Sequence, residues 1–154
     1  MRRSLQVARS VYRILEDKRD VLVRRLNDLV DIAEAEREKM AEPLRQAYLA
    51  LFKAYAKMGS VKVEAAAATT PTSIEVKVSE RIVLGIRIPM LEATSTKIPL
   101  NYGFLDTTAA FDEAVAKFRD ILVPICRVAE VENTILRLAE ELKKTQRLLN
   151  ALEH

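Results

Sequence analysis

Apolar residues recur at alternating spacings of three and four along the N-terminal part of the chain. The positions are Leu5, Ala8, Tyr12, Leu15, Leu22, Leu26, Leu29, Ala33 and Met40, with Arg19 and Glu36 as polar members. This heptad pattern predicts a helix that forms a left-handed supercoil with a partner helix. We expect the first helix to run from about Arg3 to Met58, because Gly59 fits the position just past a helix end.

A second heptad seam follows in the C-terminal part. Its members are Ile121, Val128, Val131, Ile135, Leu138, Leu142, Leu149 and Leu152, with Pro124 and Thr145 as exceptions. We expect this last helix to begin near Asp106 or Thr107, because either side chain can cap the free N–H groups. Two heptad helices in one chain most simply pair with each other antiparallel. Pro43 and Pro124 then fall at the same level, where a shared bend is expected.

The segment between the helices alternates apolar and polar residues from Ser73 to Leu91, which is typical of strands. A polar break at Ser79-Glu80-Arg81 predicts the turn of a hairpin. One apolar face would carry Ile74, Val76, Val78, Ile82, Leu84, Ile86 and Ile88. Since a lone hairpin is marginally stable, this face must dock on the helices or on a partner. The stretches 65–72 and 94–102 read as connecting loops.

The predicted fold class is therefore mainly α, a long antiparallel two-helix coiled coil with a small β-hairpin insert. We expect one elongated domain, divided into a first helix (1–58), an insert (59–105) and a second helix (106–154). The spacing and order of these elements follow from the two seams and the alternating segment alone.

Composition argues against an enzyme. His154 is the only histidine and Cys126 the only cysteine, so no transition-metal site has enough soft ligands. The three glycines are too far apart for a phosphate-binding loop. The carboxylates fall mostly beside Lys and Arg on helix faces, as in a solvated surface. We expect no catalytic residue, no metal and no cofactor, and we expect Cys126 to be a small buried apolar residue in a reducing compartment.

The net charge of +3 is unevenly placed. Basic residues begin the first helix and end the second, namely Arg2, Arg3, Arg9 and Arg13, and Lys143, Lys144 and Arg147. Antiparallel pairing would bring both sets to the open end of the helix pair. No apolar segment follows Met1-Arg2-Arg3, so we expect no signal peptide. Because there is no apolar run of about 18 residues, we also expect no direct membrane insertion. The basic end could attract nucleic-acid phosphates, but Tyr12 is the only aromatic residue near it for stacking.

Four blocks in order resemble one known family. The segment Leu138 to Glu153 reads LAEELKKTQRLLNALE and is similar to a signature of the D subunit, the central-stalk component of A-type and V-type rotary ATPases. It matches at Lys144, Thr145, Arg147, Asn150, Ala151, Leu152 and Glu153, and departs at Gln146 and Leu149. The other blocks that resemble the family are 15–20, 83–89 and 102–107.

The resemblance implies a non-catalytic rotor axle that couples ion-driven rotation to ATP synthesis or hydrolysis in a ring of catalytic subunits. Its implied partners are the A and B subunits of the ring, the F subunit of the stalk and the C subunit that connects to the membrane rotor, on the cytoplasmic side of a membrane. The expected ring-binding residues are Lys143, Lys144, Thr145, Arg147 and Asn150. The resemblance also implies that the hairpin influences ATP hydrolysis near the F subunit, and we expect it to lie away from the basic end.

Some alternatives stay open at this point. The chain is short for the family, so we expect a truncated form that lacks both tips of the coiled coil. Leu152-Glu153-His154 is also similar to the start of a vector-encoded tag. A prefoldin-type chaperone subunit, which also joins antiparallel helices through β-hairpins, is the main rival, and nucleic-acid binding is a second. The direction of the parent complex, synthase or pump, and its ion, proton or sodium, stay open too.

Overall fold

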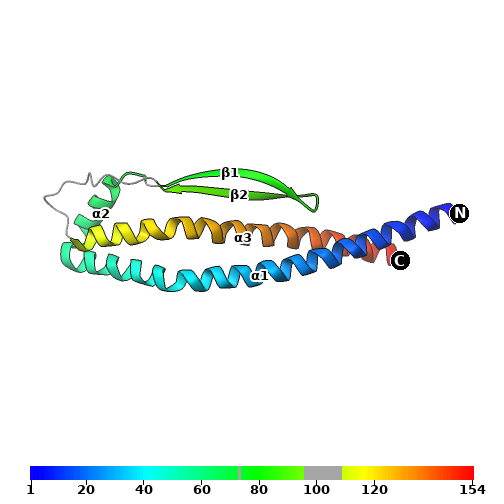
Figure 1. Cartoon of the computed structure of the whole chain (residues 1–154), viewed down its shortest axis with the longest axis horizontal. Coiled ribbons are helices and arrows are strands. Elements are labelled where there is room, and N and C mark those ends of the chain that lie inside the picture. Colours follow the sequence, from blue (N-terminus) through cyan, green and yellow to red (C-terminus); the bar gives the residue numbers. More distant parts are fainter. Residues whose placement is uncertain (73, 96–108) are drawn as a thin grey trace. The chain divides into compact units, whose positions relative to one another are not determined.

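The computed structural model describes residues 1–72, 74–95 and 109–154. In chain order these residues form helix α1 (Arg2–Met58), helix α2 (Ser60–Thr69), strands β1 (Ile74–Val83) and β2 (Ile86–Ser95), and helix α3 (Ala109–Glu153) (Figure 1). The predicted fold class is confirmed, because two long helices flank a small two-stranded antiparallel sheet. The proposed capping residues Asp106 and Thr107 lie outside the described residues.

The described chain divides into two compact units, and each contains part of α1, part of α3 and part of the hairpin. Unit 1 comprises residues 1–34, 80–89 and 130–154, and unit 2 comprises residues 35–79 and 90–129. In both units α1 and α3 lie side by side (Figure 1).

In unit 1 the helices pair antiparallel, as the heptads predict. The Tyr12 hydroxyl donates a hydrogen bond to Glu153 Oε1 at 2.7 Å, and Lys18 Nζ donates to Glu141 Oε1 at 2.6 Å. The buried core consists of Leu22, Leu29, Ile88 and Leu138, and the partly buried Leu26, Val83, Ile86, Val131, Ile135 and Leu142 pack around it. At about 1.5–3 kcal/mol for each buried leucine or isoleucine, this seam is the main source of stability in the unit.

In unit 2 the seam changes to small residues on α1. Ala47, Ala50 and Ala54 are buried there. The small side chains allow close contact with bulkier neighbours. Buried Ala54, Val63, Ala110 and Phe111 form the local core. Tyr48 and Phe118 meet edge to face with ring centroids 5.3 Å apart, a favourable aromatic geometry.

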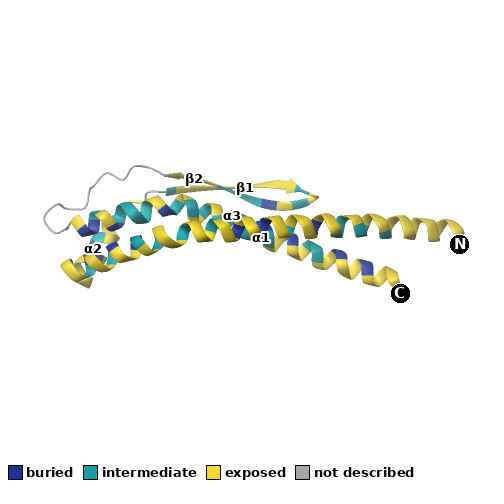
Figure 2. Ribbon diagram, turned by 60° about the horizontal axis from the view of Figure 1, so that its bottom comes forward, coloured by how far each residue is buried: buried dark blue, intermediate teal, exposed yellow. Residues whose placement is uncertain are grey.

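The seam residues have the predicted burial over most of their length. Figure 2 shows buried residues along the facing sides of α1 and α3. The exceptions lie at the outer end of the seam, where Leu5 is 58% exposed, Leu152 is 44% exposed and Ala8 is exposed as well. Cys126, which we expected to be buried, is half-buried.

The prediction of a loop over residues 65–72 is wrong for its first part. Residues Ser60–Thr69 form α2, and Val63 anchors this helix in the core of unit 2. The four consecutive alanines from Ala65 to Ala68 have the highest helix propensity of any residue, and tertiary contact through Val63 supplies the rest. Gly59, with φ of 81°, separates α1 from α2 as expected of a helix terminator.

The predicted turn at Ser79-Glu80-Arg81 is also wrong. The strands turn at Leu84 and Gly85, which have φ of 53° and 74°. Two positive φ angles define a two-residue type I′ turn, which matches the twist of the flanking strands and favours glycine. Residues 79–81 instead continue β1. Strand β2 continues to Ser95, so it includes Thr94 and Ser95, which we expected to lie in a loop. The rest of that expected loop, residues 96–102, lies outside the described residues.

The shift of the turn divides the predicted apolar face. Across a turn at Leu84-Gly85, Val83 pairs with Ile86, so odd positions of β1 share a face with even positions of β2. Val83, Ile86 and Ile88 pack against the helices of unit 1. Val76, Val78, Ile82 and Leu84 are exposed, and Ile74 is half-buried. The predicted set of seven is therefore not a single face.

Replacing Ile88 with alanine tests the docking of the hairpin. Ile88 is 1% exposed in the core of unit 1, so we expect Ile88→Ala to lower the free energy of unfolding by about 2–4 kcal/mol. Ile82, which is 73% exposed, is the matched control, and Ile82→Ala should change it by less than about 0.5 kcal/mol. Urea unfolding followed by circular dichroism measures both. Equal effects of the two substitutions would show that the hairpin does not dock through Ile88.

Candidate partner-binding surfaces

The predicted ring-binding residues all lie on α3 in unit 1, but they do not all face solvent. Lys143, Lys144, Arg147 and Asn150 are exposed. Asn150 Oδ1 accepts a hydrogen bond from Gln146 Nε2 at 2.9 Å, one turn earlier. These four residues form the exposed part of the predicted set.

Thr145 differs from the other four. Its side chain is 1% exposed, and its hydroxyl donates to the Glu141 carbonyl oxygen at 2.9 Å. A threonine that bonds back one turn satisfies its own hydroxyl within the helix, so it occupies a seam position without leaving a polar group unpaired. Thr145 belongs to the contact between the helices, and the exposed surface is made by its neighbours.

The basic residues of α1 lie in the same unit. Arg2, Arg3, Arg9 and Arg13 are exposed. The hydrogen bond from Tyr12 to Glu153 places the end of α3 beside this basic segment. Both basic sets therefore lie in unit 1, but α1 continues past the end of α3, so Arg2 and Arg3 lie beyond it (Figure 1). We call Arg2, Arg3, Arg9, Arg13, Lys143, Lys144 and Arg147 the basic collar.

The hairpin offers a second surface. Its outward side carries Ile82 in unit 1, which is 73% exposed, and Val76 and Val78 in unit 2, which are 41% and 68% exposed. Arg87 and Glu80 form a long ion pair of 4.0 Å on the same side. Sequence reasoning missed that these residues are separate from Ile86 and Ile88, although Gly85 was a signal for the true turn.

The hairpin turn is not remote from the basic end, contrary to our expectation. Residues 80–89 belong to unit 1, where Ile88 packs with Leu22 and Leu138. The basic residues of α1 and α3 belong to that unit as well. The hairpin turn and the basic collar are therefore parts of one compact unit.

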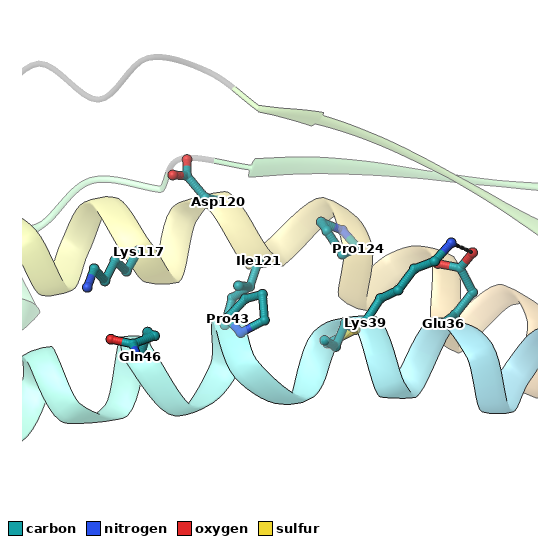
Figure 3. A pocket seen from close by; sticks show the side chains of 9 residues that line it. Glu36, Lys39, Pro43, Gln46, Lys117, Asp120, Ile121 and Pro124 are labelled. Carbon is teal, nitrogen blue, oxygen red and sulfur yellow. Dashed lines mark ion pairs between the residues drawn. The ribbon is translucent and has the colours of Figure 1, made fainter.

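A cavity of about 620 Å³ lies between α1 and α3 in unit 2, at the level of the two prolines (Figure 3). Pro43 and Pro124 both line it, which confirms that they fall at one level, and both lie inside continuous helices. A proline lacks the N–H that would bond to the carbonyl four residues earlier, here Lys39 and Asp120. The shared bend stays a prediction.

The charges around this cavity are of both signs and are largely paired. Glu36 Oε1 lies 3.8 Å from Lys39 Nζ and 3.5 Å from Arg127 Nε. Lys117 Nζ lies 3.0 Å from Glu113 Oε1. No single sign dominates, so the cavity has no clear preference for a charged ligand.

Within residues 1–72, 74–95 and 109–154 there is no group of three or more His, Cys, Asp or Glu side chains positioned for a metal ion. None of the described helices combines the length and the apolar character that crossing a membrane requires.

The chain is of the class in which two long helices pair, a β-hairpin docks on them, and charged and apolar surfaces face outward. The sequence family of the ATP synthase D subunit matches residues 1–154. The chain belongs to this family.

Several curated relatives are named as the D subunit of A-type ATP synthase. The relative from Methanopyrus kandleri is 35% identical over 152 residues, which is 97% of this chain and 66% of the relative. The relative from Methanobrevibacter smithii is 36% identical over 92% of this chain and 62% of its own length. For Thermococcus kodakarensis the identity is 34%, over 100% of this chain and 73% of the relative. The chain thus spans about two thirds of the length of these relatives.

The pKa of Tyr12 reports on the closure of the open end. The hydrogen bond to Glu153 raises the pKa of Tyr12 above its ordinary value of 10.0, and burial and the nearby carboxylates add to this. A raised pKa means that the contact stabilises the fold below pH 10 and is lost as the pH rises through the pKa of the folded state. We expect Glu153→Gln to lower the pKa of Tyr12 toward 10.0, and Glu16→Gln, which removes only a weaker charge effect, to lower it less. Titration of the labelled tyrosine ring by NMR measures both, and an unchanged pKa in Glu153→Gln would mean that the two side chains do not meet.

Proposed function

We propose that this chain is the non-catalytic central-stalk subunit of an A-type or V-type rotary ATPase. The observation that carries the proposal is the match to the D-subunit family over the whole chain, on a pair of long antiparallel helices. In this role the chain is an axle. It couples ion-driven rotation to ATP synthesis or hydrolysis by the surrounding catalytic subunits.

The packing of the helix pair is suited to transmitting torque. Interlocked side chains at Leu22, Leu138 and Leu149, each no more than 1% exposed, resist the sliding of one helix past the other. A single helix would have no such lateral contacts. The pair therefore resists twisting better than either helix alone.

The basic collar is the proposed contact with the catalytic ring, through acidic loops of the A and B subunits. A rotating axle must bind successive positions almost equally and none too tightly. Exposed charges suit this, because each solvated pair contributes only about 0.2–1 kcal/mol and exchanges readily. Lys143, Lys144, Arg147 and Asn150 are exposed as such contacts require.

The outward side of the hairpin is the proposed contact with the F subunit of the stalk, through which it influences hydrolysis. Val76, Val78 and Ile82 are exposed while Ile88 holds the hairpin to the helices. An apolar surface on a firmly docked element is suited to a lasting partner. The remaining proposed partner is the C subunit that connects to the membrane rotor, with the whole assembly on the cytoplasmic side of the membrane.

Neutralising the collar on α3 tests the ring contact. We expect the triple variant Lys143→Gln, Lys144→Gln and Arg147→Gln to lower the number of ions pumped per ATP hydrolysed by roughly threefold or more, since three rim charges of about 0.2–1 kcal/mol each are lost. The measurement is ion pumping and ATP hydrolysis by the complex reassembled with the variant.

The matched control neutralises Lys53, Lys57 and Lys77, which are exposed in unit 2. It should leave the pumping ratio unchanged. A triple collar variant that pumps and hydrolyses like the unaltered chain would refute the collar's role. It would not refute the proposed function, which is tested separately by whether the chain assembles into the complex.

Polar substitution of the outward hairpin side tests the contact with the F subunit. We expect Val78→Ser with Ile82→Ser to weaken binding of the F subunit by about tenfold, because the complex would no longer bury these two apolar side chains. The fold should be unaffected because both side chains face solvent. Titration calorimetry with the isolated F subunit gives the affinity, and Glu75→Ser with Lys77→Ser on the other side of β1 is the control. Equal affinities for all three chains would rule out this side of the hairpin as the contact.

A further inference from the structure

Strand β1 has a free edge. Among the described residues the sheet has two strands, so β2 is the only neighbour of β1. Every residue from Glu75 to Ile82 is exposed, so neither face of β1 is covered over this length. The backbone hydrogen bonds that lie outside the described helices and strands involve no residue of β1. β1 is one continuous strand, although it belongs partly to each unit, and its edge offers N–H and C=O groups to another strand.

The hairpin turn determines which backbone groups point to this edge. In a two-residue hairpin the residues on either side of the turn, here Val83 and Ile86, form a hydrogen-bonded pair. Such pairs alternate with non-bonded ones, so the odd-numbered residues of β1 bond to β2 and the even-numbered residues face the free edge. On β2 the odd-numbered residues face the opposite edge, and one of them is Pro89, which has no N–H to donate. A proline obstructs pairing at the edge of β2, whereas β1 contains no proline.

The charges of β1 indicate what pairs with its edge. Glu75, Lys77 and Arg81 are odd-numbered and therefore lie on one face of the strand. All three are exposed, and within the described residues neither Glu75 nor Arg81 forms an ion pair. A strand with an unpaired acid near one end and an unpaired base near the other is complementary to itself when two copies run antiparallel.

We propose that the free edge of β1 pairs with the same edge of a second copy of this chain, antiparallel and with Val78 opposite Val78. In this register Glu75 of each copy stands opposite Arg81 of the other, which forms two pairs of opposite charge. Val78 is even-numbered, so its N–H and C=O groups face the second copy and the central pair is hydrogen-bonded. In the proposed function the axle acts as a single copy, so this dimer is a state of the chain outside the assembled complex.

The other face of the paired strands is compatible with this register. Ile74 of one copy stands opposite Ile82 of the other, so apolar side chains meet. Glu80 falls opposite Val76, but it already has a partner in its own chain, because Arg87 Nη1 lies 4.0 Å from Glu80 Oε2. The register therefore places no charge of β1 directly opposite a like charge.

The same charges disfavour the two adjacent registers. Pairing between even-numbered residues allows the centre to move by one residue, onto Lys77 or onto Ser79. A centre at Lys77 sets two lysines opposite each other, and a centre at Ser79 sets Lys77 opposite Arg81. Like charges directly opposite are destabilising. Charges on an edge strand commonly prevent pairing, and here they leave the register centred on Val78 as the favoured one.

Exchanging the two charges tests the proposal on the isolated chain, independently of the proposed function. We expect the unaltered chain to dimerise and Arg81→Glu to raise the dissociation constant at least tenfold, because Glu75 then faces a glutamate in both pairs. Glu75→Arg with Arg81→Glu restores the opposite charges and should dimerise like the unaltered chain. Lys57→Glu makes the same change of charge at an exposed residue of α1 and is the control.

Sedimentation equilibrium gives the dissociation constants of all four chains. An unaltered chain that is monomeric throughout would overturn the proposal. So would an Arg81→Glu variant that dimerises like the unaltered chain, or a double variant that associates no better than Arg81→Glu alone.

A proline at the centre of the edge is a second test. The N–H of Val78 faces the free edge, so Val78→Pro removes no hydrogen bond to β2. We expect it to weaken dimerisation at least tenfold and to leave the helical circular dichroism signal unchanged. Ser79→Pro, which removes an N–H that bonds to β2, is the comparison and should destabilise the hairpin. Undiminished dimerisation of the Val78→Pro variant would show that the copies associate through another surface.

Discussion

The antiparallel contact between α1 and α3 is the interaction on which the other features of each unit depend. Helices of this kind are not held by propensity alone, and most of their stability comes from burying an apolar face. Leu22 and Leu138 are fully buried in unit 1, and Ala54 is fully buried in unit 2. The hairpin has no core of its own and is held in unit 1 because Ile88 packs on that same seam. If the seam were lost, the collar and the hairpin turn of unit 1 would no longer be held in their present arrangement.

The seam tolerates polar and proline residues for specific reasons. Thr134 and Thr145 are both buried, and each hydroxyl donates to the carbonyl one turn earlier, at 2.8 Å and 2.9 Å. Neither leaves a buried polar group unpaired, so neither carries the desolvation cost of one. At Pro43 and Pro124 the cavity between the helices marks a level where packing is less tight than at the alanines nearby. A helix pair that is loosely packed at one level deforms there more easily than elsewhere, because fewer contacts oppose the movement.

The sequence predicted the long elements well because their signals are long. A heptad repeated over many turns fixes both the helix and its buried face, so Leu22, Leu29, Leu138 and Leu149 were found without coordinates. The insert was predicted less well because its signals are short and compete. Four alanines in a row read as a loop beside threonines and a proline, although they form α2. The polar triplet Ser79-Glu80-Arg81 was predicted as the turn, whereas the strands turn at Leu84-Gly85. This error shifted the register and placed Ile82 and Ile88 on the same face. Thr145 is buried by the partner helix. The segment Leu138 to Glu153 that resembles the family therefore did not by itself reveal which of the predicted ring-binding residues face solvent.

In the proposed function, the collar and the outward hairpin side differ in the lifetime of the contact that each would make. The collar is charged and exposed, and such contacts are individually weak and screened by salt, which suits a ring that must be met at several positions in turn. The outward hairpin side is apolar, and apolar area is stabilised by being covered throughout. A partner that rotates with the axle can cover this side permanently, whereas ring subunits cannot. The packing of Ile88 that fixes the hairpin to the helices of unit 1 would then also fix the stalk partner to the axle.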